Sequence, residues 1–289
     1  MLLEIKNIKK SFYQKTGVFG ENRSCVKAVD NVDLVINQGE NIGLVGESGC
    51  GKTTLARIVL RLLKSDSGSI LFNGVDITKG SSAKLKHARR NMQMVFQDPY
   101  SSLDPRFTIE NIMEEGFTLG KGEWCSKSTR RERIFETFAA VNLNRDILER
   151  YPHEFSGGER QRIAIARSLV LNPKLLILDE AVSSLDVIIQ KQIVDLLADL
   201  RKRYDLTYLF ISHNLKVVQK ICQKIAVMYK GKIVELASAD DIFKDPLHPY
   251  TKELLAASVE YRSVKGSAKI EFNDEMRLVD MGRNHFLLK

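Results

Sequence analysis

The segment from Gly46 to Thr53 constrains this chain more than any other part of it. Its letters, GESGCGKT, match the pattern G-x-x-x-x-G-K-[ST], whose backbone wraps around the phosphates of a nucleotide. Glycines permit the tight turn that points backbone N–H groups inward at an anion. An apolar run precedes the segment at residues 41–45, and helical apolar spacing follows it over residues 54–63. This order predicts a strand, a phosphate loop and a helix whose N-terminus faces the phosphates.

The loop places two kinds of side chain where a nucleotide needs them. Lys52 can reach the β- and γ-phosphates, and Thr53 can offer its hydroxyl to Mg²⁺. Cys50 stands where a small residue is required, so we interpret it as a spacer and not as a nucleophile. The ATP contacts expected from this segment are Gly46, Glu47, Ser48, Gly49, Cys50, Gly51, Lys52, Thr53 and Thr54.

A second element, residues 175–180, fits the first. Its letters, LLILDE, form a short apolar run that ends in two carboxylates, as expected of a strand buried on both faces of a parallel sheet. Ligands bind at the carboxyl ends of such strands. We therefore expect Asp179 to hold Mg²⁺ and Glu180 to polarise an attacking water. Taken alone, the pair could equally be solvated acids at a strand end.

Composition narrows the class of protein. The chain has 289 residues, of which 44% are hydrophobic, enough for a sizeable core in one domain with insertions or in two small domains. No signal peptide and no apolar stretch of ~20 residues is present, so we expect a soluble protein that reaches a membrane only through a partner. Four cysteines scattered singly favour a reducing cytosol over disulfides or a metal cluster.

The chain is basic, with a net charge of +8 and a pI near 9.2. Its basic clusters are spread along the sequence and are not interleaved with aromatic residues, as a groove for single-stranded nucleic acid would require. A solvated basic surface is the leading explanation, with anionic lipid as the alternative and nucleic acid as a remote one.

Strands and helices alternate on either side of a helical middle section. Apolar runs at 5–8 and 26–36 predict N-terminal strands, and residues 109–116, 129–141 and 145–151 have helical patterns. After Glu180 the order is helix (185–203), strand (208–212), helix (215–222) and strand (225–229), which implies a mostly parallel sheet. Beyond residue 264 the polar tail predicts no regular structure.

Five ordered motifs resemble those of ATP-binding cassette (ABC) ATPases. The segment 155–162, FSGGERQR, is similar to the family signature L-S-G-G-Q. Gln97 resembles the Q-loop glutamine, residues 183–186 (SSLD) the D-loop, and His213 the switch histidine. Phe12, or alternatively Tyr13, falls where an aromatic residue would stack on adenine. The resemblance covers roughly residues 1–257.

The resemblance implies a fold and a catalytic arrangement. The fold is α/β: a P-loop NTPase (RecA-like) core with a mostly parallel sheet, an N-terminal antiparallel β subdomain and an inserted α-helical subdomain. It assigns residues 1–257 to the ATPase domain, with the insertion at about 98–165, and 258–289 to a C-terminal tail. Glu180, His213 and Gln97 would be catalytic, and Thr53, Gln97 and Asp179 would hold Mg²⁺.

The signature segment implies a composite site. Ser156, Gly157 and Gly158 can cap a helix and present bare N–H groups to an anion. By the resemblance they bind the γ-phosphate of ATP held by a second subunit, which we expect to be a related but non-identical cassette. The segment departs from the family at Phe155 and Glu159. Glu159 brings a carboxylate close to a phosphate, a mild electrostatic cost that Arg160 or Arg162 could offset.

Two stretches point to one branch of the family. Residues 96–106 and 248–255 resemble the ATPase subunits of oligopeptide, dipeptide and nickel importers. Many members of that branch hold an iron–sulfur centre with tail cysteines, but no cysteine follows Cys222 here. That cofactor is therefore not expected, and its absence weakens the oligopeptide assignment and leaves room for nickel or metallophore importers. The resemblance still implies an ATPase that energises peptide uptake, with a nickel or metallophore importer as the alternative and a non-transport ABC ATPase acting on nucleic acid as a remote one.

If the chain serves an importer, we expect it to bind two transmembrane permease subunits and to act indirectly with an extracytoplasmic solute-binding protein. We do not expect nucleic acid as a partner. The chain would lie peripherally on the cytoplasmic face of the inner membrane. We expect the loop 97–106, stiffened by Pro99 and Pro105, to form a groove with the helices that follow it and to receive a short cytoplasmic helix of the permease.

Overall fold

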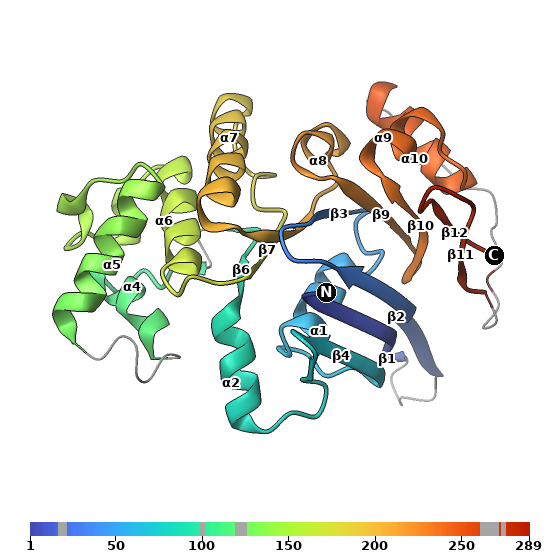
Figure 1. The fold of residues 1–289 in the computed structure, drawn as a ribbon, viewed down its shortest axis with the longest axis horizontal. Coiled ribbons are helices and arrows are strands. Elements are labelled where there is room, and N and C mark those ends of the chain that lie inside the picture. The colour runs from blue at the N-terminus through green and yellow to red at the C-terminus, as the bar shows by residue number, and fades with distance from the viewer. Residues whose placement is uncertain (17–21, 99–101, 119–125, 261–271, 273–275) are drawn as a thin grey trace. The chain divides into compact units, whose positions relative to one another are not determined.

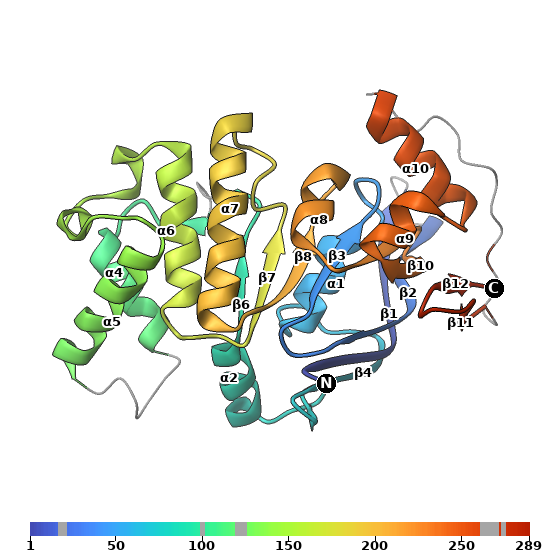
Figure 2. The same ribbon diagram turned by 45° about the horizontal axis from the view of Figure 1, so that its top comes forward.

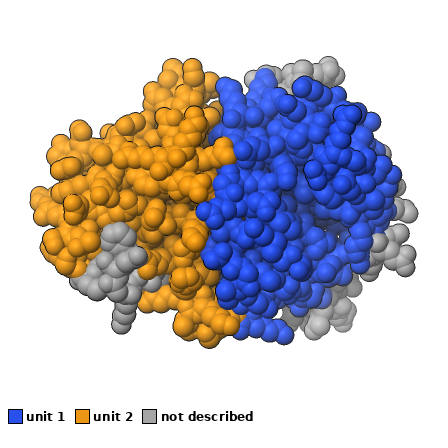
Figure 3. Space-filling view, in the orientation of Figure 1, with its two compact units in different colours: residues 1–79, 210–289 blue, residues 80–209 orange. Residues whose placement is uncertain are grey.

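The computed structural model covers residues 1–289 and describes residues 1–16, 22–98, 102–118, 126–260, 272 and 276–289. The chain forms two compact units (Figure 3). The first unit contains residues 1–79 and 210–289, and the second contains residues 80–209.

An antiparallel sheet is formed by the N-terminal part of the first unit. Its strand order is β2-β1-β4-β5, and the pairing of β1 with β2 begins at Leu3 opposite Ile36. Leu3 and Ile5 are buried while Lys6 is exposed, because successive side chains of a strand point to opposite faces. The strands are β1 (Leu3–Thr16), β2 (Asn22–Ile36), β4 (Ser67–Phe72) and β5 (Val75–Asp76).

A second sheet of the first unit has the order β11-β12-β10-β9-β3. β3 and β9 run parallel, β10 runs antiparallel to β9, and every residue of β3 is buried. The strands are β3 (Asn41–Val45), β9 (Lys224–Tyr229), β10 (Lys232–Ser238), β11 (Leu278–Asp280) and β12 (Phe286–Leu288). The helices of this unit are α1 (Lys52–Val59), α8 (Leu215–Ile221), α9 (Ala239–Lys244) and α10 (Pro249–Glu260).

The second unit combines strands with a helical group. β6 (Met92–Val95) and β7 (Leu175–Asp179) pair in parallel, and β8 (Thr207–Ile211) begins in this unit. α4, α5 and α6 pack against one another (Figure 1), and Figure 2 shows α6 beside α7. The helices are α2 (Ser82–Asn91), α4 (Ile109–Phe117), α5 (Lys127–Ala140), α6 (Gly157–Leu169) and α7 (Val187–Tyr204), with short 3-10 turns η1 (Arg145–Ile147) and η2 (Pro152–Glu154).

Several of these helices begin at a residue whose side chain accepts hydrogen bonds from the first N–H groups of the helix. Thr108 accepts from the Asn111 N–H at the start of α4, and Ser126 accepts from the Thr129 N–H at the start of α5. At the start of α7, Asp186 accepts from two backbone N–H groups at 3.1 and 2.9 Å. Each such cap satisfies a donor that the helix itself leaves free, and is worth about 1 kcal/mol.

The predicted α/β fold, with an N-terminal antiparallel sheet and a mostly parallel core, is confirmed. The segment 145–151 is the exception among the expected helices, because only the 3-10 turn η1 forms there. This segment instead caps another helix, because the carbonyl oxygens of Leu148 and Arg150 accept hydrogen bonds from the first two N–H groups of α4. Pro99 and Cys125 lie outside the described residues.

The tail differs from its expectation. We predicted no regular structure beyond residue 264, yet β11 and β12 form a hairpin whose second strand pairs with β10 at Glu235 and Leu236. Gly282 has a φ of 106° in the turn, a conformation that suits glycine. Strands of three residues have too little pattern to be recognised in a polar sequence, and here the edge of β10 supplies their partner.

Candidate nucleotide-binding site

The phosphate loop connects β3 to α1 in the first unit, and its glycines are required by close backbone contacts. Gly46 and Gly51 have φ values of 151° and 113°. A Cβ on Gly46 would collide with the Met228 carbonyl oxygen, and one on Gly51 with the Ala28 carbonyl oxygen. Glycine is therefore the residue that both the backbone conformation and the available space permit at these positions.

The start of α1 is built to receive an anion. Gly51 occupies the N-cap position and provides no side-chain cap for the first N–H groups of the helix. The Lys52 ammonium is buried and donates to the carbonyl oxygens of Gly46 at 2.8 Å and Glu47 at 2.7 Å. The N-terminal end of a helix and a nearby ammonium together favour phosphate at this place.

Cys50 contributes shape rather than reactivity. Its side chain is buried, with Sγ 3.7 Å from the Lys52 Nζ. Burial raises the pKa of the thiol, although the charge of Lys52 opposes this shift. Because the thiolate is the reactive form, a protonated thiol supports the interpretation of Cys50 as a spacer.

Two further residues expected at the site, Phe12 and His213, also belong to the first unit. The Phe12 ring on β1 is 41% exposed, with the Lys10 ammonium 5.6 Å from its centre. His213 is exposed in the turn between β8 and α8, where Asn214 caps the helix. Both side chains are accessible to a ligand, and their contacts with adenine and the γ-phosphate remain predictions.

The carboxylates expected at the site belong to the second unit. Asp179 is buried at the end of β7, and Glu180 follows it with a φ of 48°. A non-glycine residue in this left-handed region costs of order 1–3 kcal/mol. The N–H and hydroxyl of Ser183 both donate to the Glu180 carbonyl oxygen, at 3.0 and 2.9 Å, and hold the turn.

The structure brings Gln97 and Glu180 together. β6 and β7 run parallel with Val95 opposite Leu178, so the residues after both strands emerge at the same edge. The Gln97 side-chain amide donates to Glu180 Oε2 at 2.9 Å. The glutamine thereby orients the carboxylate that we expect to act on water.

The signature segment forms a capping box at the start of α6. The Ser156 hydroxyl accepts from the Glu159 N–H at 3.4 Å, and the Glu159 carboxylate accepts from the Ser156 N–H at 2.9 Å. The same carboxylate also accepts the Ser156 hydroxyl proton, at 2.7 Å. A hydroxyl has one proton to donate, so Ser156 must release Glu159 before it can donate to a phosphate.

Hydrogen bonds and a nearby positive charge stabilise the Glu159 carboxylate. Hydrogen bonds from Ser156, together with the charge of Arg150, lower the pKa of the Glu159 carboxyl. Arg160 donates to the carbonyl oxygens of Pro152 and His153, and Arg162 to that of Val141. Arg150, a residue that the sequence did not single out, is therefore one cation that acts on Glu159. The offset expected from Arg160 or Arg162 near a phosphate stays a prediction.

Sequence reasoning also missed Tyr250. This residue lies at the start of α10 in the first unit, and its hydroxyl oxygen accepts from the Glu47 N–H of the phosphate loop at 2.9 Å. The segment 248–255 was noted only for its resemblance to one family branch. Nothing in the sequence around this tyrosine predicts that its hydroxyl contacts the backbone of the phosphate loop.

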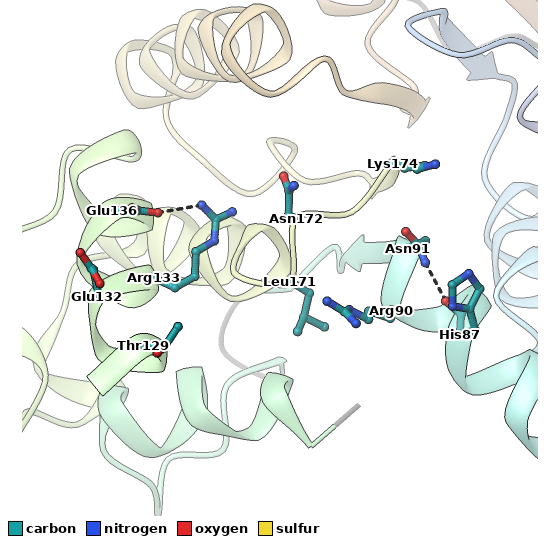
Figure 4. A pocket seen from close by; sticks show the side chains of 10 residues that line it. All are labelled: His87, Arg90, Asn91, Thr129, Glu132, Arg133, Glu136, Leu171, Asn172 and Lys174. Atoms are coloured by element: carbon teal, nitrogen blue, oxygen red, sulfur yellow. Dashed lines mark hydrogen bonds and ion pairs between the residues drawn. The ribbon is translucent and has the colours of Figure 1, made fainter. Parts of the chain in front are cut away.

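Two pockets lie in the second unit, and neither contains the nucleotide motifs. One, with a volume of about 620 Å³, opens between α2 and α5 and is lined by polar and charged side chains such as Arg90, Arg133 and Lys174 (Figure 4). The other, of about 770 Å³, lies beside the loop after β6 and is lined by Gln93, Ser102, Leu103, Asp104, Pro105, Arg106, Glu115, Gly116, Thr118 and Arg167.

Comparison with known proteins supports the motifs over most of the chain. A family model described as "ABC transporter" matches residues 29–183, and one described as "Oligopeptide/dipeptide transporter, C-terminal region" matches residues 234–278. The chain is 48% identical over 271 residues to the oligopeptide transport ATP-binding protein AppF of Bacillus subtilis, covering 93% of this chain and 82% of that protein. It is 49% identical over 257 residues to OppF of the same organism, covering 89% and 82%.

Solved structures agree with the fold. The chain resembles the ATP-binding cassette MJ0796, solved as a dimer in a post-hydrolysis state with ADP and phosphate, with a TM-score of 0.72 and 26% identity. The match covers 82% of this chain and 99% of that one. The cassette cbiO1 of Clostridium perfringens matches at a TM-score of 0.70 and 24% identity, covering 84% and 91%.

The position of Lys52 predicts the effect of removing it. We expect Lys52→Ala to weaken ATP binding more than about 100-fold, because charge-assisted contacts to phosphate contribute strongly to affinity. Isothermal titration with MgATP measures the change, and Lys79→Ala, at an exposed lysine of the same unit, is the matched control. Near-normal affinity in Lys52→Ala would show that the site is wrongly assigned.

Proposed function

The chain belongs to the ABC transporter ATPases, and on this premise we propose that it hydrolyses ATP to drive the uptake of oligopeptides through a membrane permease. The observation that carries the proposal is the phosphate loop, with its buried lysine and glycine-dependent backbone, in a chain that matches both the ABC transporter model and the C-terminal region of oligopeptide and dipeptide transporters. AppF and OppF, to which the chain is about half identical, are named for oligopeptide transport. This similarity favours peptides over nickel or a metallophore as the solute.

Nucleotide binding follows from the loop and the helix behind it. Lys52 and the N–H groups at the start of α1 would hold the phosphates, with Phe12 stacked on adenine. We propose Thr53, Gln97 and Asp179 as the residues that hold Mg²⁺, because hydroxyl, amide and carboxylate oxygens are the ligands this ion prefers. When bound, the ion neutralises charge on the β- and γ-phosphates.

Hydrolysis would use the residues that follow the parallel strands. Glu180, oriented by the Gln97 amide, would accept a proton from the attacking water. His213, exposed after β8, would contact the γ-phosphate and help to orient that water. Lys52 would stabilise the negative charge on the transferring phosphoryl group.

A complete site would require two cassettes. Ser156, Gly157 and Gly158 would bind the γ-phosphate of ATP held by a second ABC subunit, as the dimer of the related MJ0796 cassette suggests. We propose a non-identical second cassette, two permease subunits and an extracytoplasmic binding protein as the rest of the importer. No helix in the described part of the chain is long and apolar enough to cross a bilayer, so the subunit would attach to the cytoplasmic face of the membrane through the permease.

The groove beside the loop after β6 is the surface we propose for the permease. Its residues come from 102–106, from α4 and from Arg167 of α6. The Arg167 guanidinium donates to the Ser102 carbonyl oxygen at 2.6 Å and fixes the loop against α6. Asp104 and Arg106 pair at the rim, and the hydrogen bonds from Arg106 lower the pKa of Asp104 to about 2. A short helix seated here would follow any movement of Gln97 when the γ-phosphate binds or leaves.

The role of Glu180 is tested by Glu180→Gln. We expect this variant to bind ATP within a few-fold of the parent and to hydrolyse it at least about 100-fold more slowly, because a general base contributes roughly 10²–10⁴-fold. The measurement is phosphate release by the assembled transporter, with Glu149→Gln, an exposed glutamate of the same unit, as control. Turnover close to that of the parent would remove Glu180 from the mechanism.

The hydrogen bond from the Ser156 hydroxyl to the Glu159 carboxylate predicts that a variant of Glu159 needs less ATP for hydrolysis. Glu159→Gln replaces a carboxylate acceptor by a weaker amide and removes a charge, so we expect the ATP concentration for half-maximal hydrolysis to fall by about two- to fivefold. Ser156→Ala, which removes the hydroxyl, should change it in the opposite direction. An unchanged or higher value in Glu159→Gln would contradict this account.

The permease groove can be tested by cross-linking. We expect Ser102→Cys to form a disulfide with a cysteine placed in a short cytoplasmic helix of the permease, in a background where Cys25 and Cys125 are serine. Lys84→Cys, exposed on α2, is the control position. Absence of the Ser102→Cys product in a complex that still transports peptide would reject the groove; Ser101 lies outside the described residues.

A further inference from the structure

A single peptide group of the phosphate loop is held from both sides. The Gly46 carbonyl and the Glu47 N–H belong to the same planar unit. The carbonyl oxygen accepts from the Lys52 ammonium at 2.8 Å, and the N–H donates to the Tyr250 hydroxyl oxygen at 2.9 Å. Because the unit is planar, it cannot turn at one end without turning at the other. The orientation of the carbonyl that contacts Lys52 therefore depends on the Tyr250 hydroxyl.

Tyr250 is itself rigidly placed. Its side chain is fully buried and stacks on the Tyr229 ring at the end of β9, with 4.2 Å between ring centres. Burial raises the pKa of the phenol, so the Tyr250 hydroxyl is neutral at physiological pH. Its oxygen accepts a hydrogen bond from the Glu47 N–H. A buried aromatic ring with two stiff torsions is a precise support for a backbone group.

The start of α10 is fixed by a carboxylate from β10. Glu235 is fully buried and accepts from the N–H groups of Leu247 at 2.8 Å and His248 at 3.0 Å. The His248 ring nitrogen Nδ1 in turn accepts from the Tyr250 N–H at 3.1 Å. The His285 ring, in the turn of the tail hairpin, contacts the same carboxylate at 2.6 Å. A continuous series of hydrogen bonds thus connects the tail to the phosphate loop.

We propose that Tyr250 is a positioning residue for nucleotide binding, whose hydroxyl fixes the Gly46–Glu47 peptide and with it the place of the Lys52 ammonium. β10, the start of α10 and the turn of the tail hairpin then act together as a support for the phosphate loop. Without the hydroxyl, the Glu47 N–H loses its acceptor at a partly buried position, and the peptide can rotate. Binding of the phosphates must then also order the loop, and this lowers the affinity for nucleotide.

The test is Tyr250→Phe, which keeps the ring and removes only the hydroxyl. The matched control is Tyr208→Phe, because the Tyr208 side chain is equally buried and its hydroxyl also makes one backbone hydrogen bond, to the Leu197 carbonyl oxygen at 2.9 Å. Thermal unfolding should show losses of stability of similar size in both variants. Titration with MgATP and with MgADP should show about three- to tenfold weaker binding in Tyr250→Phe and less than twofold change in Tyr208→Phe.

A second readout separates positioning from general damage. In the assembled transporter we expect Tyr250→Phe to raise the KM for ATP by about three- to tenfold, with kcat within twofold of the parent. Misfolded protein would instead lower the apparent kcat and leave KM unchanged. The proposal is overturned if nucleotide affinity and KM stay at the parent values, or if Tyr208→Phe weakens nucleotide binding as much as Tyr250→Phe does.

Discussion

The close approach of two glycines to neighbouring backbone is the constraint on which the site depends. Gly46 packs against the Met228 carbonyl of β9, and Gly51 against the Ala28 carbonyl of β2. Any side chain at either position would push the loop away from the strands that define its shape. With the loop seated in this way, the Lys52 ammonium donates to two of its carbonyl oxygens. The N-terminus of α1, an end of a helix that favours an anion, follows the loop directly.

The second unit contains the groups that we propose respond to the nucleotide. The parallel pair β6 and β7 brings Gln97 to Glu180, while the loop after β6 leads on to the permease groove. Ser156 begins α6 with its hydroxyl already committed to Glu159. In the proposed mechanism, hydrolysis and mechanical output share one loop. The proposed half-site for a second cassette is restrained by the Glu159 carboxylate, which must release the Ser156 hydroxyl. These features suit a subunit whose activity depends on its partners.

Much of this arrangement was predictable from the sequence because the decisive signals are local. β3 and β7 are short apolar runs of five residues each, and their ends place the phosphate loop and the acidic pair. The predictions that failed depended on contacts with distant parts of the chain. The helical pattern at 145–151 gave way to a 3-10 turn whose carbonyls cap α4, and the tail hairpin depends on an edge strand more than forty residues earlier in the chain.

The sequence by itself determined the nucleotide chemistry, since glycine spacing, one lysine and two carboxylates at strand ends leave few alternatives to phosphate binding. Only the tertiary structure decided what supports that chemistry. Tyr250 lies far from Glu47 in the sequence, Arg150 acts on Glu159 across a turn, and His285 contacts Glu235 from the tail. Contacts of this kind depend on how distant parts of the chain come together, and the pattern within one element does not say which distant residue it will meet.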